Sequence, residues 1–398
     1  MQGTNRAATR GLPELIISVD DHIIEPPDVW EARLPAGLRE RGPRVVETDR
    51  GQAWEIDGER RRIVGIAASA NRNGEDRFSM KGVRYSEIMP GAYDAKARLA
   101  DMDEDGVAVQ ILFDNLPGFA GATFLELAER DPELALACVR AYNDWLAADW
   151  CATAPTRLIP QCILPLWDLS LSADEVSRAA ELGHRGVLLP GVPAHLDLPA
   201  FSDAAWHGVF RSAEDAGIPI VMHIGGTASR KSQVTDLRSE PDPVALETAK
   251  AMTPLVNCEA LAGLMFAGVP ELFPNLKMVS AEAGIGWWPY LSERLDEIYT
   301  KHRLWEKTPL TAPPSEYLAR QVYASFILDD AGMASRELIG RDRIMWSSDY
   351  PHADSTWPNS RQLLTEHYGQ LPEEDLTAIL GGNALAVYGL TVPAEARD

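Results

Sequence analysis

The stretch SVDDHIIEPPDVW (18–30) places two aspartates, a histidine and a glutamate directly behind a run of apolar residues. We predict a buried strand over residues 15–22, LIISVDDH, which ends before the two prolines that follow. Asp20 and His22 are two positions apart, so on a strand their side chains face the same way, while Asp21 faces the opposite way. This strand therefore presents a carboxylate and an imidazole together at its carboxyl end.

Short apolar runs recur along the chain and alternate with longer amphipathic stretches. Several of the runs are continuously apolar, which is typical of parallel strands that are buried on both faces. The alternation predicts repeated strand–helix units, and eight such units favour a (β/α)8 TIM barrel over an open sheet. The predicted strands are 15–22, 107–113, 157–164, 185–191, 218–224, 276–282, 321–326 and 343–349.

Two insertions interrupt this alternation within a single predicted domain over residues 15–390. The first, 26–95, follows strand one and contains RVVETDRGQAWEIDGERRRIV, which predicts an added β-hairpin. The second, 226–275, follows strand five. Because long loops in a compact domain are usually functional, and both of these follow carboxyl ends of strands, we expect them to cover a site. Residues 1–14 and 391–398 are expected to be disordered tails.

Charge and composition exclude several classes of partner. The 37 lysines and arginines against 59 aspartates and glutamates give a formal net charge of −22, which disfavours nucleic acid and anionic membranes. No apolar run approaches the ~20 residues that span a bilayer, and the N-terminus lacks a signal-peptide core, so we expect a cytoplasmic protein. The four cysteines lack any C-x-x-C spacing and are expected to be free thiols.

Acidic and imidazole side chains gather at the carboxyl ends of the predicted strands. His223 ends strand five, Glu282 ends strand six, and Asp349 ends strand eight with His352 three residues later. In a barrel of this kind catalytic groups lie at those ends. With Asp20 and His22, His223 and Asp349 form a predicted set of nitrogen and oxygen ligands for a divalent metal. The other five histidines fall in helices or connections and receive no role. The acids of RLADMDEDGV (98–107) are expected to form a solvated helix face.

Four of these stretches carry a resemblance to a known family. They are VDDHIIEP (19–26), IPIVMHIGG (218–226), FPNLKMVSAEAGIGWWPYLSERLD (273–296) and IMWSSDYPHADSTWP (344–358). The chain resembles the amidohydrolase-related (amidohydrolase 2) proteins of the amidohydrolase superfamily. Within them it is similar to the branch of aminocarboxymuconate semialdehyde decarboxylase and γ-resorcylate decarboxylase. The resemblance implies a barrel, one divalent metal at the strand ends, and hydrolysis or nonoxidative decarboxylation of a small organic acid or amide.

The resemblance carries over position by position, with two departures. Asp20 and His22 match the opening acid and histidine of the family, but Ile24 stands where a second histidine often occurs. The missing ligand is either unnecessary or supplied by Glu25, for which a structural role before Pro26 is the alternative. Strand six has Glu282 where related enzymes place a histidine for acid–base work.

These residues define the predicted chemistry. Asp20, His22, His223, Asp349 and Glu25 are the candidate metal ligands, and Asp349, Glu282 and His352 are the candidate catalytic groups. We rank zinc first as the metal, with Mn2+ or Fe2+ as alternatives. Metal-assisted hydrolysis of a small acid, amide or ester is the leading prediction. Nonoxidative decarboxylation of an aromatic or unsaturated acid and a catalytically inactive binding barrel are the alternatives. A small-molecule substrate is expected, and a homodimer or homotetramer is possible.

Overall fold

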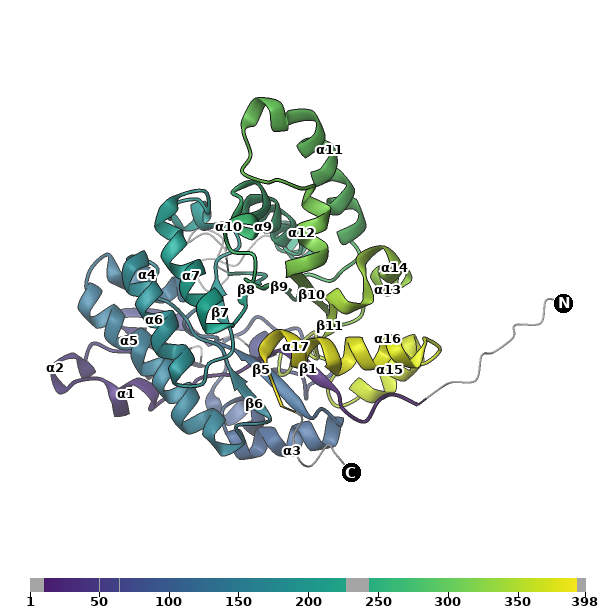
Figure 1. Cartoon of the computed structure of the whole chain (residues 1–398). Coiled ribbons are helices and arrows are strands. Elements are labelled where there is room, and N and C mark those ends of the chain that lie inside the picture. The colour runs from purple at the N-terminus through teal and green to yellow at the C-terminus, as the bar shows by residue number, and fades with distance from the viewer. Residues whose placement is uncertain (1–10, 50, 64, 227–242, 392–398) are drawn as a thin grey trace.

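The computed structural model describes residues 11–49, 51–63, 65–226 and 243–391, and within them eight parallel strands form a barrel (Figure 1). Neighbouring strands pair in parallel in the orders β1–β5–β6 and β7–β8–β9–β10–β11. A bridge between Cys162 and Val187 joins the two sets. The N–H of Asp349 donates to the carbonyl of Asp20 at 3.0 Å and closes the barrel. The predicted (β/α)8 fold is confirmed. The barrel strands are β1 (Ile17–His22), β5 (Val109–Phe113), β6 (Leu158–Pro160), β7 (Val187–Leu189), β8 (Ile220–His223), β9 (Met278–Ala281), β10 (Val322–Phe326) and β11 (Ile344–Trp346).

Helices separate the barrel strands and surround them (Figure 1). Local signals set their ends: the side chain of Asp94 caps the start of α3, and Gly106 ends it with φ 72°. The helices of the described ranges are α1 (Val29–Arg33), α2 (Ala36–Arg39), α3 (Ala95–Asp105), α4 (Ala122–Ala128), α5 (Pro132–Trp145), α6 (Leu169–Glu181), α7 (His207–Ala216), α8 (Pro243–Met252), α9 (Leu255–Phe266), α10 (Val269–Leu272), α11 (Trp288–Glu306), α12 (Pro314–Gln321), α13 (Asp330–Ala334), α14 (Arg336–Ile339), α15 (Ser360–Tyr368), α16 (Glu373–Thr377) and α17 (Asn383–Tyr388).

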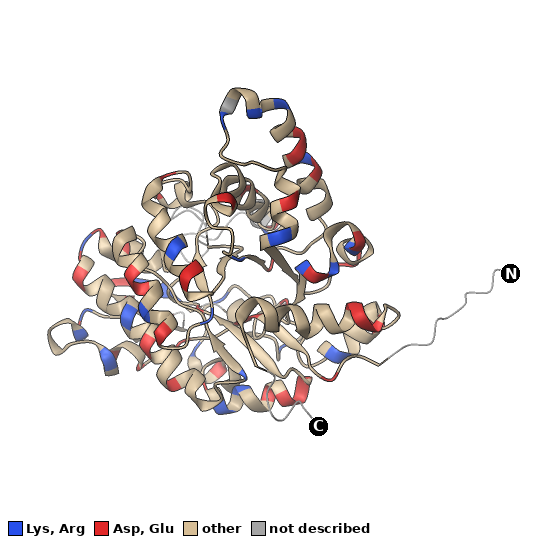
Figure 2. Cartoon of the chain, viewed as in Figure 1, with Lys and Arg blue, Asp and Glu red and all other residues tan. Residues whose placement is uncertain are grey.

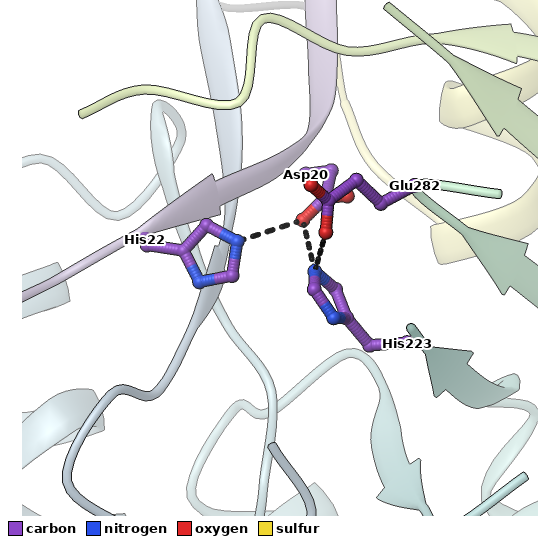
Figure 3. A group of neighbouring side chains, drawn as sticks. All are labelled: Asp20, His22, His223 and Glu282. Carbon is purple, nitrogen blue, oxygen red and sulfur yellow. Dashed lines mark ion pairs between the residues drawn. The ribbon is translucent and has the colours of Figure 1, made fainter. Parts of the chain in front are cut away.

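Alternate residues of the barrel strands pack into two different layers. On β8, Ile220 and Met222 join the cluster that the surrounding helices share, whereas Val221 joins the other core cluster. Because successive side chains of a strand point to opposite faces, His223 lies on the inner face with Val221. On β1 the pairing register with β5 shifts between Ser18 and Asp21, and beyond this shift Asp20 and His22 both face the side chain of His223 (Figure 3). The inward side chains at the ends of β1 and β8 therefore lie at the carboxyl end of the barrel.

The first insertion forms a sheet of its own. It contains three antiparallel strands in the order β2–β3–β4, where two were expected. The rest of the insertion is bonded to the loop after β11, since Arg77 donates to the carbonyls of Ala353 and Ser355. The insertion therefore lies over the carboxyl end of the barrel. The strands are β2 (Arg44–Thr48), β3 (Gly51–Ile56) and β4 (Glu59–Arg62).

Other expectations fall partly or wholly outside the described ranges. Residues 227–242 of the second insertion, 1–10 of the first tail and 392–398 of the second tail are not described. The remainder of the second insertion forms α8, α9 and α10. All four cysteines are free thiols, as expected.

Acidic and basic residues are interspersed over the outer helices (Figure 2). No cation-rich face stands out in this view. Within the described part of the chain, none of the helices combines the length and the apolar character that crossing a bilayer requires.

Candidate metal centre

Four side chains from three strand ends converge at the carboxyl end of the barrel (Figure 3). Asp20 and His22 come from β1, His223 is the last residue of β8, and Glu282 follows β9. His223 Nε2 lies 3.3 Å from Asp20 Oδ1 and 3.1 Å from Glu282 Oε2. His22 Nε2 lies 3.4 Å from Asp20 Oδ1. Asp20 Oδ1 is thus the oxygen that both imidazoles share.

A second group adjoins the first through His22. His22 Nε2 lies 3.4 Å from Asp349 Oδ1, and His352 Nδ1 lies 2.9 Å from the same oxygen. The rings of His22 and His352 stack with centroids 3.8 Å apart. Burial lowers the pKa of both imidazoles, that of His22 strongly. Both are therefore held in the neutral form that can ligate a metal or accept a proton.

Several carboxylate oxygens and imidazole nitrogens of this centre lack hydrogen-bond partners. Both carboxylate oxygens of Asp20 and of Asp349, Nε2 of His22 and Nε2 of His223 are buried without one. Such groups are costly to bury unless something satisfies them. Ligand atoms about 2.1 Å from one ion lie about 3.0 Å apart in an octahedron and about 3.4 Å apart in a tetrahedron. The observed separations of 3.1–3.4 Å match that spacing, so the residues present fit a single divalent metal.

The electrostatics of the centre also favour a cation. Burial opposes protonation of His223, but the charges of Asp20 and Glu282 outweigh it and raise the pKa of the imidazole to about 10. Burial, with the charge of Asp349, raises the pKa of Glu282 well above its ordinary value. Burial and the charge of Asp20 do the same to Asp349. For Asp20, the neighbouring His223 and His22 outweigh burial and hold its pKa below the usual range. The centre retains protons because its carboxylates are crowded, and a divalent ion would take their place.

The backbone at two of these carboxylates is in the left-handed region. Glu282 has φ 58° and Asp349 has φ 55°. Non-glycine residues adopt this conformation at a cost of about 1 kcal/mol or more, and it persists where the surroundings impose it. The N–H of Glu282 donates to Ser325 Oγ at 3.1 Å, which helps to hold the turn that aims its side chain inward.

Glu25 is the predicted ligand that the structure does not bring into either group. Its buried carboxylate instead accepts hydrogen bonds from the backbone N–H groups of Asn115 at 2.9 Å and Leu116 at 3.0 Å. Burial raises the pKa of Glu25 to about 8, although both N–H groups favour the ionised form. Both oxygens of Glu25 thus face the loop after β5. This arrangement agrees with the alternative of a structural carboxylate and not with that of a metal ligand.

Arg98 is a residue of the site that the sequence did not reveal. Its guanidinium is fully buried and donates to the carbonyls of Gly91 and His22 and to Gln110 Oε1. It also lies over the ring of Tyr350, 4.3 Å from the centroid. The hydrogen bond to the carbonyl of His22 fixes the backbone at the end of β1, at the residue that carries the imidazole. Nothing in the local sequence distinguishes this arginine from a surface residue.

The helix that carries Arg98 also corrects one expectation. Its acids in 98–107 were expected to face solvent, and Asp103 and Glu104 do. Asp105 is buried, however, and accepts hydrogen bonds from the N–H and hydroxyl of Ser360. The solvated-face prediction is therefore wrong for Asp105, because helix α15 covers that side of α3.

A cavity of about 400 Å³ opens above Glu282, Asp349 and His352. This volume is near the small end of ligand pockets, which range over about 300–1,000 Å³. The first insertion forms one wall of the cavity. The residues that it contributes are Trp54, Arg61, Arg62, Ile63, Ile66 and Ala67.

Two neighbouring arginines on β4 reach this cavity and differ in their partners. Arg61 pairs with the carboxylate of Glu126. Arg62 has its Nε buried without a hydrogen-bond partner. A buried cationic donor of this kind suits an anion that enters the cavity. The signal in the sequence was the run of three arginines, ERRR (59–62), within a strongly acidic chain.

A parallel barrel with one nitrogen- and oxygen-liganded metal centre beneath a small cavity defines a class of metal-dependent enzymes that act on small molecules. A family model described as amidohydrolase matches residues 91–390, and the chain belongs to that family. The resemblance inferred from the four sequence stretches is confirmed.

Two curated relatives are decarboxylases. The γ-resorcylate decarboxylase of Rhizobium radiobacter is 28% identical over 288 residues, which cover 67% of this chain and 80% of the relative. The 2-amino-3-carboxymuconate-6-semialdehyde decarboxylase of Dictyostelium discoideum is 23% identical over 318 residues, covering 79% and 82%.

Solved structures share the fold over almost the whole chain. An amidohydrolase from Mycobacterium avium subsp. paratuberculosis K-10 has a TM-score of 0.74 at 23% identity, covering 95% of this chain and 98% of that one. A dihydroxybenzoic acid decarboxylase from Polaromonas sp. JS666 has a TM-score of 0.61 at 20% identity, covering 96% and 99%. That decarboxylase was solved with bound manganese and the inhibitor 2-nitroresorcinol.

The protein is therefore an enzyme of the amidohydrolase superfamily, a hydrolase or decarboxylase with a site for one divalent metal. The relatives agree better with the decarboxylase alternative than with the hydrolase that the sequence analysis ranked first. Manganese, not zinc, is the metal bound in the Polaromonas structure.

Proposed function

We propose that the protein is a manganese-dependent, nonoxidative decarboxylase of a small hydroxylated aromatic acid. The observation that carries this proposal is the buried, unpaired Nε of Arg62 on the cavity that contains Asp349 and His352. A guanidinium donor in that position favours a substrate with a carboxylate. The aromatic acids named for the relatives belong to this chemical class.

The walls of the cavity suit a flat ring. Trp54 on β3 and Phe119 after β5 both line it. Aromatic side chains favour offset-stacked or edge contacts with another ring. A cavity of about 400 Å³ has room for a single substituted benzene ring with its polar groups.

Manganese is proposed ahead of zinc because of the donor set. Asp20, Glu282 and Asp349 offer carboxylate oxygens beside the imidazoles of His22 and His223. Oxygen-rich sets of this kind suit manganese, whereas zinc favours nitrogen and sulfur in fewer positions. When bound, the ion would hold oxygens of the substrate and stabilise negative charge that develops on them.

The residues around the centre then have distinct proposed roles. Arg62 orients the substrate by its carboxylate or a neighbouring oxygen. The pair formed by Asp349 and His352, 2.9 Å apart, delivers a proton to the ring carbon that bears the leaving carboxylate. The bond from that carbon to the carboxylate breaks, its electron pair restores the aromatic ring, and carbon dioxide leaves. His352 faces the cavity and returns a proton from solvent to the pair. Glu282 is proposed as a ligand rather than as the acid–base group.

Carbon dioxide release tests the proposal directly. The manganese-loaded protein is incubated with 2,6-dihydroxybenzoate and related hydroxybenzoates in deuterated water. We expect carbon dioxide and a phenol that carries one deuterium at the former carboxylate carbon. The exposed Asp174→Asn variant on α6 should behave as the wild type does.

Hydrolysis is measured on the same preparation with aromatic amides and esters. Release of amine or alcohol, without carbon dioxide from any aromatic acid, would establish the hydrolytic reading and overturn the proposal. The expected dimer or tetramer remains a prediction, which sedimentation analysis of the same protein would test.

A further inference from the structure

The loop Asp114–Gly121, which follows β5, is held by a carboxylate from the opening stretch of the chain. Oε1 of Glu25 accepts from the N–H of Asn115 at 2.9 Å, and Oε2 accepts from the N–H of Leu116 at 3.0 Å. Glu25 is fully buried. Both of its oxygens are thus committed to two successive backbone groups, which fixes the direction in which the loop leaves β5.

The far side of the loop has a strained backbone. Four successive residues have positive φ: Gly118 (84°), Phe119 (46°), Ala120 (108°) and Gly121 (83°). Two of them are not glycine, and left-handed conformations of such residues persist only where their surroundings impose them. The buried carboxylate of Asp114 accepts from the N–H of Phe119 at 2.9 Å. Carboxylates therefore brace the loop at its start and at its turn.

The braced turn places the ring of Phe119 against the metal centre. The ring stacks on His223 with centroids 4.6 Å apart and meets His22 edge-on at 5.1 Å. The fit around this residue is close: a Cβ on Gly225 would lie 3.3 Å from the ring, and one on Gly226 would lie 2.6 Å from the carbonyl oxygen of Phe119. Phe119 therefore has little freedom to move, and it lines the cavity.

From these contacts we infer that Phe119 sets the preference of the cavity for a planar ring, and that Glu25 is the positioning residue that holds it there. Glu25 acts through the loop, because its carboxylate contacts the backbone and not the centre. The choice of a planar ring as ligand rests on the proposed function. The hydrogen-bonded brace rests on the structure alone.

Three variants separate these roles. Glu25→Gln replaces one acceptor oxygen with an amide NH2 group, which cannot accept from a backbone N–H. Phe119→Leu keeps an apolar side chain without the flat ring, and the double variant combines both changes. Glu175→Gln is the matched control, since Glu175 is equally buried but bonds to Asn143 and Arg178 away from the cavity. Glu25→Asp, which keeps the carboxyl group on a shorter side chain, is measured in parallel in case Glu25→Gln does not fold.

Three measurements are made on the manganese-loaded proteins. They are hydrogen exchange of peptides that cover 114–121, the Kd for 2-nitroresorcinol, and the KM for decarboxylation. In Glu25→Gln and Glu25→Asp we expect exchange in that segment to rise at least about tenfold, because one protected amide loses its acceptor in Glu25→Gln and the shorter carboxylate of Glu25→Asp is drawn back from both amides. We expect Kd and KM to rise about fivefold to tenfold in Glu25→Gln and in Phe119→Leu. A rise of this size corresponds to the loss of one aromatic contact between Phe119 and the ligand. The double variant should be no worse than Phe119→Leu, and the metal content should stay at one ion per chain.

Other results would overturn the inference. They are additive losses in the double variant, loss of manganese from Glu25→Gln with exchange unchanged, or no binding of 2-nitroresorcinol by the wild type. The proposed function fails separately: if the wild type binds 2-nitroresorcinol with the expected pattern but releases no carbon dioxide, the inference stands and the function does not. If carbon dioxide is released and neither Glu25→Gln nor Phe119→Leu changes Kd or KM, the function stands and the inference does not.

Discussion

Binding of manganese should raise the thermal stability of the protein by about 3 °C. The perturbation is removal of metal with a chelator, followed by addition of Mn2+ to about 100 times its Kd. A ligand that binds only the folded state then stabilises it by about 2.7 kcal/mol. For 398 residues, an unfolding entropy of about 2.1 cal/mol/K per residue gives about 0.8 kcal/mol/K. The ratio of these two quantities is the expected shift in Tm.

Removal of one proposed ligand should nearly abolish that shift. His223→Ala deletes the imidazole that lies 3.3 Å from Asp20 and 3.1 Å from Glu282. If the affinity falls about 100-fold, the same manganese concentration equals the new Kd and stabilises by only about 0.4 kcal/mol, or about 0.5 °C. Asp174→Asn, an exposed substitution on α6, should keep the full shift.

The assay is differential scanning calorimetry of the chelator-treated proteins with and without Mn2+. Each variant is compared with its own metal-free Tm, so that a change in intrinsic stability does not enter the comparison. Equal shifts in the wild type and His223→Ala, or no shift in the wild type, would refute the assignment of the buried, unpartnered atoms to a metal centre.

Four further predictions follow from single contacts. Arg98→Met should lower the free energy of unfolding in urea by about 4.5 kcal/mol, because three acceptors lose a charged donor at about 1.5 kcal/mol each; a loss below about 1 kcal/mol would contradict this. Arg62→Gln should raise KM for the aromatic acid about tenfold or more with kcat little changed, as loss of a charged hydrogen bond predicts. His352→Gln should lower kcat about 100-fold while manganese content by elemental analysis stays the same. For Glu25, the pKa rises from 4.5 in the unfolded chain to about 8 in the fold, so its stabilising effect is complete below about pH 4.5 and is lost as the pH rises to 8; urea titrations should show this slope, up to roughly 5 kcal/mol, in the wild type but not in Glu25→Gln.

The barrel was predictable because its signal is distributed over the whole chain. Each observed barrel strand falls inside the range predicted for it, since buried parallel strands read as short apolar runs. The residues brought together at the centre were predictable for a related reason. Carboxyl ends of parallel strands meet at one end of a barrel, so His223 and Asp349 converge whatever the details of the loops.

What the sequence could not reveal depends on loop direction and on long-range partners. Glu25 stands three residues beyond His22, and only the path of the chain after β1 decides whether it turns toward the ion or toward the loop after β5. The guanidinium of Arg98 donates hydrogen bonds to two backbone carbonyls and a glutamine, and no sequence pattern predicts such partners. The unpaired Nε of Arg62 likewise becomes visible only when β4 is seen against the cavity.

The backbone of the centre explains why its carboxylates act as one unit. Asp349 is in the left-handed region at φ 55°, and its N–H donates to the carbonyl of Asp20 at 3.0 Å. One proposed ligand residue thereby holds the backbone of another. Glu282, at φ 58°, is held in the same way by Ser325 on the neighbouring strand. Because the strained turns are fixed by bonds between strand ends, a change in one carboxylate turn should displace the others, and the geometry of the centre depends on barrel closure itself.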